Sequence, residues 1–215
     1  MSEKAEAHSD LMDRIYRHQR FIYDLTRKYY LFGRDRMIRE LALKPGSRLV
    51  EIGCGTARNL VKIARRYPGV ELFGLDASQE MLKSAADTVA RARLSDRIHL
   101  AHGYAEALTP ATFGQDAGFD ACLFSYSLSM IPDWQTAVAV AENNLATGGQ
   151  LHIVDFGDLA GLGGLARRAL LGWLSLFHVA PRTALLQRLE QIPGAHLRLL
   201  PGRYAFLFSS EKRRP

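Results

Sequence analysis

Residues 49–60, which decide the fold, read Leu49-Val50-Glu51-Ile52-Gly53-Cys54-Gly55-Thr56-Ala57-Arg58-Asn59-Leu60. The first four residues are typical of a buried β-strand, because most of them are apolar and two are β-branched. Gly53 and Gly55 allow a sharp turn and a close approach of the backbone to a ligand, since glycine has no Cβ. A helical pattern follows, and a helix that begins after such a turn presents unpaired N–H groups. This arrangement predicts a site for a nucleotide or another adenosyl ligand.

Three further residues narrow the choice of ligand. Arg58 stands where a dinucleotide fingerprint has glycine or alanine. Glu51 comes just before the turn, where its carboxylate can meet an ammonium group. A second strand over residues 70–75 ends at Asp76, 21 residues after Gly55, and an acid at that place can accept both hydroxyls of a ribose. A plain βαβ turn without a ligand is the alternative.

These features resemble class I S-adenosylmethionine-dependent methyltransferases. Ala57 stands where that family usually has a third glycine, and Met81 would lie against the adenine unless it packs in the core. The resemblance implies that S-adenosylmethionine is the cofactor, with S-adenosylhomocysteine as its product. It implies a cofactor-binding set of Arg34, Glu51, Gly53, Gly55, Asp76, Ala77, Met81, Ala105, Glu106 and Ser125.

Composition sets outer limits on the function. The chain has 215 residues, 47% hydrophobic and 23% charged, which are ordinary values for a single soluble domain. No apolar run is long enough to span a bilayer, and the N-terminus lacks a secretory pattern, so we expect a cytoplasmic protein. Cys54 and Cys122 have neither metal-ligand nor disulfide spacing, so we expect no metal.

The net charge of +6 is unevenly distributed. Residues 1–48 carry 11 Lys and Arg against 7 Asp and Glu, and residues 156–215 carry 9 against 3. Residues 49–155 carry 8 against 12, so an acidic centre lies between two basic flanks. Basic surface can serve nucleic acid, anionic lipid or only solubility.

Strand and helix patterns alternate along the chain, which predicts an α/β fold. We expect a Rossmann-like, doubly wound, mostly parallel sheet with an antiparallel terminal hairpin. The predicted single domain has an N-terminal helical lid (1–45), a cofactor-binding core (46–156), a helical cap or membrane-facing insertion (157–195) and the hairpin (196–209).

The N-terminal pattern over residues 10–32 is an amphipathic helix. Tyr16, Tyr23 and Tyr30 recur every seven residues, and so do Arg20, Arg27 and Arg34, which keeps each set near one helix face. The helix either covers the cofactor pocket, with its tyrosines toward the acceptor, or is an ordinary core-facing helix.

Hydroxyl groups gather where the fourth strand, residues 119–126, is expected to end. Ser125, Tyr126, Ser127 and Ser129 follow one another there. Because strand ends at the carboxyl side of an open α/β sheet face the ligand crevice, these hydroxyls are candidates to position an acceptor nitrogen.

A closer resemblance covers nearly the whole chain. Residues 17–35, 125–132 and 173–182 are similar to bacterial diacylglyceryl-homoserine N-methyltransferases, which complete the betaine lipid diacylglyceryl-trimethylhomoserine. The resemblance implies three methyl transfers to the lipid amine. Bacterial phosphatidylethanolamine N-methyltransferases share a similar opening and are the nearest alternative.

This resemblance implies roles for further side chains. The proton acceptor is left open among Tyr23, Tyr126, His178 and water. Aromatic faces attract a growing quaternary ammonium, and an arginine suits the acceptor's carboxylate. The substrate-binding candidates are Tyr16, Arg27, Tyr30, Ser127 and Arg182.

The implied partners are a membrane lipid and an anionic membrane surface. Residues 159–179 are apolar with Arg167-Arg168 among them, which suits an interfacial helix or a packed cap. We therefore expect a peripheral protein on the inner face of the membrane. Nucleic acid is not expected as a partner, because no interleaved basic and aromatic strands occur.

Two alternatives remain outside lipid methylation. One is a methyltransferase for a soluble small molecule. The other is a non-catalytic protein that binds S-adenosylmethionine and yields no methylated product. The oligomeric state stays open.

Overall fold

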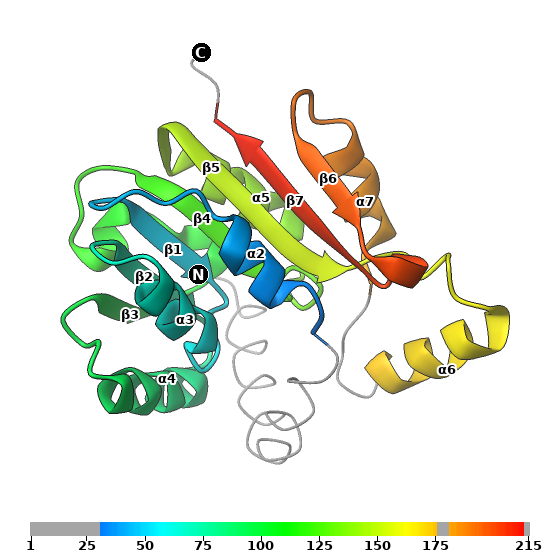
Figure 1. Cartoon of the computed structure of the whole chain (residues 1–215), viewed down its shortest axis with the longest axis horizontal. Coiled ribbons are helices and arrows are strands. Elements are labelled where there is room, and N and C mark those ends of the chain that lie inside the picture. Colours follow the sequence, from blue (N-terminus) through cyan, green and yellow to red (C-terminus); the bar gives the residue numbers. More distant parts are fainter. Residues whose placement is uncertain (1–30, 176–180, 213–215) are drawn as a thin grey trace.

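The computed structural model describes residues 31–175 and 181–212, in which seven strands form one sheet in the order β3-β2-β1-β4-β5-β7-β6 (Figure 1). The strands are β1 (Arg48–Ile52), β2 (Glu71–Asp76), β3 (Ile98–His102), β4 (Phe119–Ser125), β5 (Leu145–Phe156), β6 (His196–Leu199) and β7 (Ala205–Glu211). Strands β1 to β5 pair in parallel, whereas β7 is antiparallel to both β5 and β6. The predicted fold class is confirmed.

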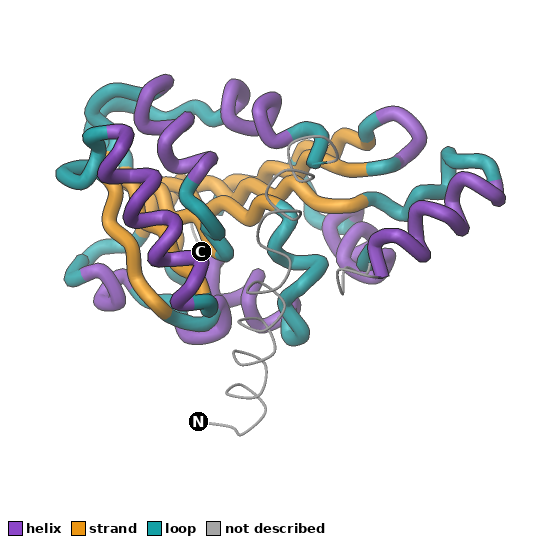
Figure 2. Tube along the Cα trace, turned by 90° about the horizontal axis from the view of Figure 1, so that it is seen from below, coloured by secondary structure: helices purple, strands orange, loops and turns teal. Residues whose placement is uncertain are grey.

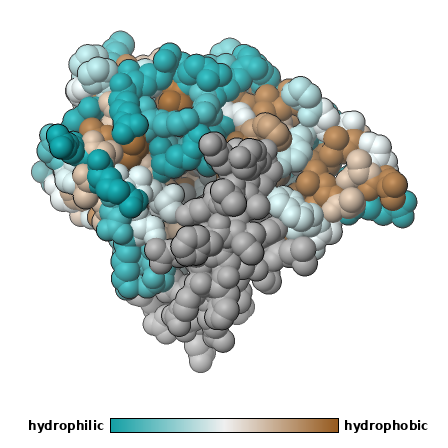
Figure 3. Space-filling view, turned by 60° about the horizontal axis from the view of Figure 1, so that its bottom comes forward, coloured by the Kyte–Doolittle hydropathy of each residue, from teal (hydrophilic) through white to brown (hydrophobic). Residues whose placement is uncertain are grey.

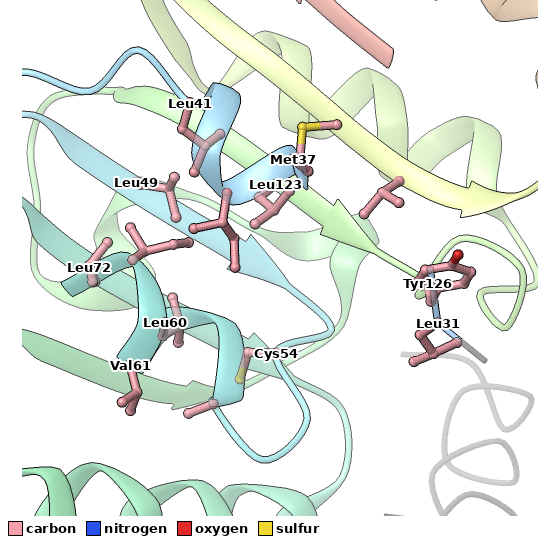
Figure 4. Packing of buried hydrophobic residues seen from close by; sticks show 14 of the residues in the cluster. Leu31, Met37, Leu41, Leu49, Cys54, Leu60, Val61, Leu72, Leu123 and Tyr126 are labelled. Atoms are coloured by element: carbon pink, nitrogen blue, oxygen red, sulfur yellow. The ribbon is translucent and has the colours of Figure 1, made fainter. Parts of the chain in front are cut away.

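Helices cover both faces of the sheet (Figure 2). The helices are α2 (Arg34–Glu40), α3 (Arg58–Arg66), α4 (Gln79–Ala92), α5 (Trp134–Asn143), α6 (Gly164–Ser175) and α7 (Thr183–Glu190). Side chains of α2, α3 and α4 share one hydrophobic cluster with the sheet, and side chains of α5 and α7 share a second. Successive side chains of a strand point alternately into the two clusters, so β1 is buried on both faces, as parallel strands usually are. Figure 4 shows part of the first cluster.

The end of β4 differs from the prediction. The apolar pattern predicts a strand through Tyr126, but β4 ends at Ser125, and Tyr126 has a left-handed φ of 58°. Tyr126 N still donates to Val154 O at 2.8 Å, so the hydrogen-bond ladder continues while the chain direction changes. Hydropathy does not detect this turn, because the side chain of Tyr126 is only 2% exposed, like those of the strand before it.

Two other predicted segments can be compared with the structure only in part or differ from it in extent. The helix expected over residues 10–32 falls almost wholly outside the described residues. Residues 159–179 were expected to be helical, but α6 begins only at Gly164. Between residues 31 and 175 and between 181 and 212, no helix is long and apolar enough to cross a membrane.

Strand β5 carries two buried titratable side chains with opposite pKa shifts. Burial lowers the pKa of His152 to about 4. Burial also raises the pKa of Asp155 to about 6, although the amides of Phe156 and Ser129 and the charge of Arg182 oppose the rise. As pH falls from 6.5 to 4, His152 destabilises the fold because the unfolded chain binds more protons. Over nearly the same range Asp155 stabilises it, because the folded chain binds the extra proton.

We therefore predict that these two groups largely offset each other. Between pH 7 and pH 5, Asp155→Asn should lose roughly 1 kcal/mol more unfolding free energy than the wild type, since the effect of His152 is then unopposed. His152→Gln should lose less than the wild type over the same interval. Urea unfolding at the two pH values measures both differences. Equal changes in all three proteins would contradict the opposition of the two groups.

Candidate functional site

A cleft of about 620 Å³, open mouth included, lies at the carboxyl ends of β2, β1 and β4. The chain order of the sheet reverses between β1 and β4, and ligands of open α/β folds bind at this kind of point. The lining residues come from four strand ends and the loops that follow them. They are Ile52, Gly53, Gly55, Leu75, Asp76, Ala77, Ser78, Gly103, Ala105, Tyr126, Ser127, Met130 and Ile131.

The glycine turn forms one edge of the cleft. Gly53 and Gly55 have left-handed φ values of 76° and 54°, which favour glycine. The amides of Gly53 and Cys54 donate to Leu75 O at 2.8 and 3.0 Å, which fixes the turn to the end of β2. A Cβ on Gly53 would lie 2.5 Å from the Cβ of Ser127, so the two sides of the cleft meet more closely than a side chain permits.

Asp76 is held by two backbone amides at the end of β2. Gly55 N donates to Oδ2 at 2.7 Å, and Ser78 N donates to Oδ1 at 2.9 Å. A carboxylate oxygen can accept more than one hydrogen bond. Asp76 is therefore fixed in place and can still accept hydroxyl groups of a ligand, as a ribose requires.

Glu51 lies behind the glycine turn and is not part of the cleft lining. Its side chain is 1% exposed, and Asn59 Nδ2 donates to its Oε1 at 2.7 Å. The same amide donates to Ser125 Oγ at 3.0 Å, so Asn59 joins the ends of β1 and β4. Asn59 was not singled out in the sequence; its only signal is a polar residue in an otherwise apolar helix face.

The Cys54 thiol is unsuited to nucleophilic chemistry. Burial raises its pKa well above the ordinary value, and the negative charges of Asp76 and Glu51 add to the rise. The thiol therefore stays protonated. Cys54 therefore serves as a small buried residue in the glycine turn.

The hydroxyls that follow β4 hold the backbone around them. Ser127 Oγ donates to Ile52 O at 2.8 Å, and Tyr126 Oη donates to Phe32 O at 2.6 Å. The ring of Tyr126 also meets that of Phe156 edge to face, with centroids 4.7 Å apart. Figure 4 shows Tyr126 beside Leu31 at the end of β4. Tyr126 and Ser127 both line the cleft, but their hydroxyls are hydrogen-bonded to main-chain carbonyls.

Arg182 also contacts backbone. Its Nε donates to Leu128 O at 2.9 Å and its Nη2 donates to Ile131 O at 2.7 Å. Burial lowers the pKa of Arg182, and the nearby charge of Asp155 opposes this. The sequence suggested this arginine for a substrate carboxylate, whereas the structure places two of its nitrogens on carbonyls of the cleft wall.

The other predicted residues fall into three groups. Ala77 and Ala105 line the cleft. Four residues do not line it: Met81 packs in the core, Ser125 contacts Asn59, Arg34 donates to Leu31 O, and Glu106 lies in the short 3₁₀ helix Ala105–Ala107. Five lie outside the described residues, namely Tyr16, Tyr23, Arg27, Tyr30 and His178.

The described lining fits an adenosyl ligand that carries no phosphate. Asp76 supplies hydroxyl acceptors, and Ile52, Leu75 and Met130 supply apolar walls. No lysine or arginine is among the described lining residues, so a pyrophosphate would lack a cationic partner there. In the described part of the chain, no three His, Cys, Asp or Glu side chains are grouped to hold a metal ion.

Comparison with known families agrees with this geometry. Residues 49–149, which run from β1 into β5, match the family model described as a methyltransferase domain. A ubiquinone/menaquinone biosynthesis C-methyltransferase UbiE of Syntrophotalea carbinolica is 31% identical over 150 residues, which cover 65% of this chain and 61% of that protein. A demethylmenaquinone methyltransferase of Corynebacterium glutamicum is 30% identical over 139 residues, or 62% and 54% of the two chains. The chain thus spans less than two thirds of these relatives.

Solved structures share the fold. The S-adenosylmethionine-dependent methyltransferase SibL aligns with a TM-score of 0.61 and 22% identity over 93% of this chain and 58% of that one. The [4+2]-cyclase SpnF aligns with a TM-score of 0.51 and 27% identity over 57% and 43%. Because a cyclase is among these structures, the fold by itself does not define the reaction.

Proposed function

We propose that this chain, whose residues 49–149 match a methyltransferase domain, is a class I S-adenosylmethionine-dependent methyltransferase that methylates the amine of diacylglyceryl-homoserine at a membrane surface. S-adenosylmethionine is the cofactor, and it supplies an electrophilic methyl group on a sulfonium. The cleft supports this use, because its lining includes the glycine turn and Asp76, and Asp76 can hold a ribose. The proposed substrate extends the sequence resemblance: the exposed surface of α6 supports a lipid acceptor, and the lining of the cleft supports an amine.

Helix α6 follows the carboxyl end of β5 and projects away from the sheet (Figure 1), and the cleft lies at the carboxyl ends of neighbouring strands. Leu165 is 80% exposed, and the neighbouring Arg167 and Arg168 are exposed as well. Figure 3 shows hydrophobic side chains gathered on this projecting part. An acid-free helix with exposed leucine and paired arginines suits the boundary of an anionic bilayer. A lipid headgroup in that bilayer would then lie on the side of the molecule from which the cleft is entered.

This surface gives a prediction about membrane binding. Arg167→Glu with Arg168→Glu should weaken binding to phosphatidylglycerol vesicles by at least about 10-fold, because each basic residue near such a surface contributes about 1 kcal/mol. The matched control is Arg65→Glu with Arg66→Glu, an adjacent exposed pair at the end of α3. Vesicle co-sedimentation at low and high salt measures the effect. Equal loss in both double variants would argue against a specific role for α6.

Quinone C-methylation is the second candidate, because the curated relatives described above carry quinone methyltransferase names. Both candidates need an amphiphilic acceptor, so α6 suits either one. The described lining favours the amine, since the lipid ammonium can release its proton to water before each attack, and the attack itself then needs no base in the site. Asp76 and the Tyr126 phenol are the ionisable groups of that lining, and both are engaged with backbone groups.

Tyr126 provides a test of the proton acceptor. Tyr126→Phe should lower the rate of methyl transfer no more than about 5-fold and cost about 1 kcal/mol of stability, because the hydroxyl donates to Phe32 O. A general base would give a loss of at least about 100-fold. Transfer rates and urea unfolding of the variant separate these outcomes.

The decisive experiment compares acceptors directly. Purified protein with methyl-labelled S-adenosylmethionine is given mixed micelles of diacylglyceryl-homoserine, phosphatidylethanolamine or demethylmenaquinone. Label in mono-, di- and trimethylated homoserine lipid would support the proposal and give the number of methyl groups. Label only in phosphatidylethanolamine products, or only in the methylated quinone, would contradict the proposal and identify that lipid as the acceptor. Cofactor binding without label in any acceptor would point to a soluble acceptor or a non-catalytic role.

A further inference from the structure

The loop that follows β4, residues 126–131, forms one wall of the cleft. We call it the β4 loop. It contributes Tyr126, Ser127, Met130 and Ile131 to the lining. In the sheet, β4 lies on one side of β1, whereas β2, which carries Asp76, lies on the other. The β4 loop therefore faces the part of the cleft away from the ribose acceptor.

The backbone of this loop is strained at its first residue. Tyr126 has a φ of 58°, and a left-handed conformation costs a non-glycine residue about 1–2 kcal/mol. A bulky side chain in this conformation persists only where surrounding contacts hold it. The loop thus depends on groups outside it.

Two charged side chains that lie outside the cleft lining hold the loop. Asp155, 2% exposed on β5, accepts from Ser129 N at 3.0 Å through Oδ2. Arg182, just before α7, donates to Leu128 O at 2.9 Å and to Ile131 O at 2.7 Å. Together they satisfy three backbone groups within residues 128–131.

Each of these side chains makes two hydrogen bonds to backbone groups, and the shape of the side chain allows both at once. The planar fork of Arg182 spans two carbonyls that are three residues apart, which a single ammonium cannot copy. Both oxygens of Asp155 accept from amides, Oδ1 from Phe156 N and Oδ2 from Ser129 N. An asparagine would have to place its own N–H₂ against one of these donors.

From these contacts we infer that Asp155 and Arg182 are positioning residues that set the shape of the acceptor side of the cleft. This inference rests on the proposed function, because it assigns this side of the cleft to a methyl acceptor. The contacts of the two residues are observed in the structure. The two residues should control turnover of the acceptor and leave cofactor affinity nearly unchanged. Arg182 thereby has a role through the backbone in place of a direct contact with a substrate carboxylate.

The chain offers matched controls for both residues. Arg203 donates from Nε and Nη2 to Asp158 at 2.7 and 2.6 Å, with the same fork and near the same end of β5. Within the described part of the chain, neither Arg203 nor Asp158 is hydrogen-bonded to the β4 loop. Arg203→Lys and Asp158→Asn therefore repeat the chemical changes of Arg182→Lys and Asp155→Asn at a site that does not hold the loop.

Hydrogen–deuterium exchange of the intact protein is the first measurement. We expect Arg182→Lys and Asp155→Asn to raise exchange in peptides covering 126–131 by at least about 10-fold, and the two controls to leave it unchanged. In the same variants the Kd for S-adenosylhomocysteine should change less than about 3-fold. The kcat for the acceptor identified in the micelle assay should fall about 10- to 100-fold, since small displacements near the reacting atoms have effects of this size.

Two results would overturn the inference. One is unchanged exchange in Arg182→Lys, which tests the contacts even if Asp155→Asn does not fold. The other is a loss of S-adenosylhomocysteine affinity as large as the loss of kcat, which would make the loop part of the cofactor site. If the wild type methylates none of the acceptors, the proposed function fails, while the exchange and affinity measurements still decide the role of the two residues.

Discussion

An Asp76→Asn variant should bind S-adenosylhomocysteine about 10- to 100-fold more weakly than the wild type. Both carboxylate oxygens of Asp76 accept from backbone amides, those of Gly55 and Ser78. Asparagine has one oxygen, so its N–H₂ group must face one of these donors. Loss of a hydrogen bond to a charged group costs about 1.5–3 kcal/mol, and the glycine turn is displaced as well.

Isothermal titration calorimetry with S-adenosylhomocysteine measures this loss. Asp120→Asn is the matched control, because Asp120 accepts from one backbone amide, Arg48 N at 2.7 Å, at the opposite end of the sheet. Asparagine can keep that bond through its oxygen, so the control should bind normally. A Kd for Asp76→Asn within about 5-fold of the wild type would show that the cofactor does not use this carboxylate.

Gly53→Ala should lower the free energy of unfolding by about 2–5 kcal/mol. The left-handed φ of 76° costs alanine about 1–2 kcal/mol. The new methyl group would lie 2.5 Å from Ser127 Cβ, and overpacking of this kind costs about 1–3 kcal/mol more. Ser127 must move to relieve the contact, and it holds Ile52 O and lines the cleft. We therefore expect the variant to bind S-adenosylhomocysteine more weakly as well.

Gly46→Ala separates the two contributions in a urea titration. Gly46 has a similar φ of 84°, and nothing lies within 4 Å of an added Cβ. It should cost only about 1–2 kcal/mol, from backbone conformation alone. Adding Ser127→Gly to Gly53→Ala removes the crowded Cβ and should recover part of the difference. If Gly53→Ala and Gly46→Ala are equally destabilising, the close approach of the two loops does not matter to the fold.

The site depends on both local and distant interactions. The glycine turn and Asp76 were identified together in the sequence, and the structure joins them through Gly55 N and Asp76 Oδ2. Their meeting follows from a short βαβ unit, in which two neighbouring parallel strands end at the same edge of the sheet. The alternation of strand and helix patterns, separated by turn residues, was likewise enough to predict the order of strands and helices.

The amino-acid sequence alone was therefore enough to predict the sheet, the cleft at the carboxyl ends of its strands and the place of Asp76 beside the glycine turn. The tertiary structure alone decided the partners of Tyr126, Arg182 and Asp155. Tyr126 and Phe32 are 94 residues apart, and Arg182 is 51 and 54 residues from the carbonyls it contacts. A hydroxyl or a guanidinium can bond any carbonyl within reach, and residue type does not say which one the fold brings there. Sequence patterns record local periodicity, whereas these contacts arise from the packing of distant segments.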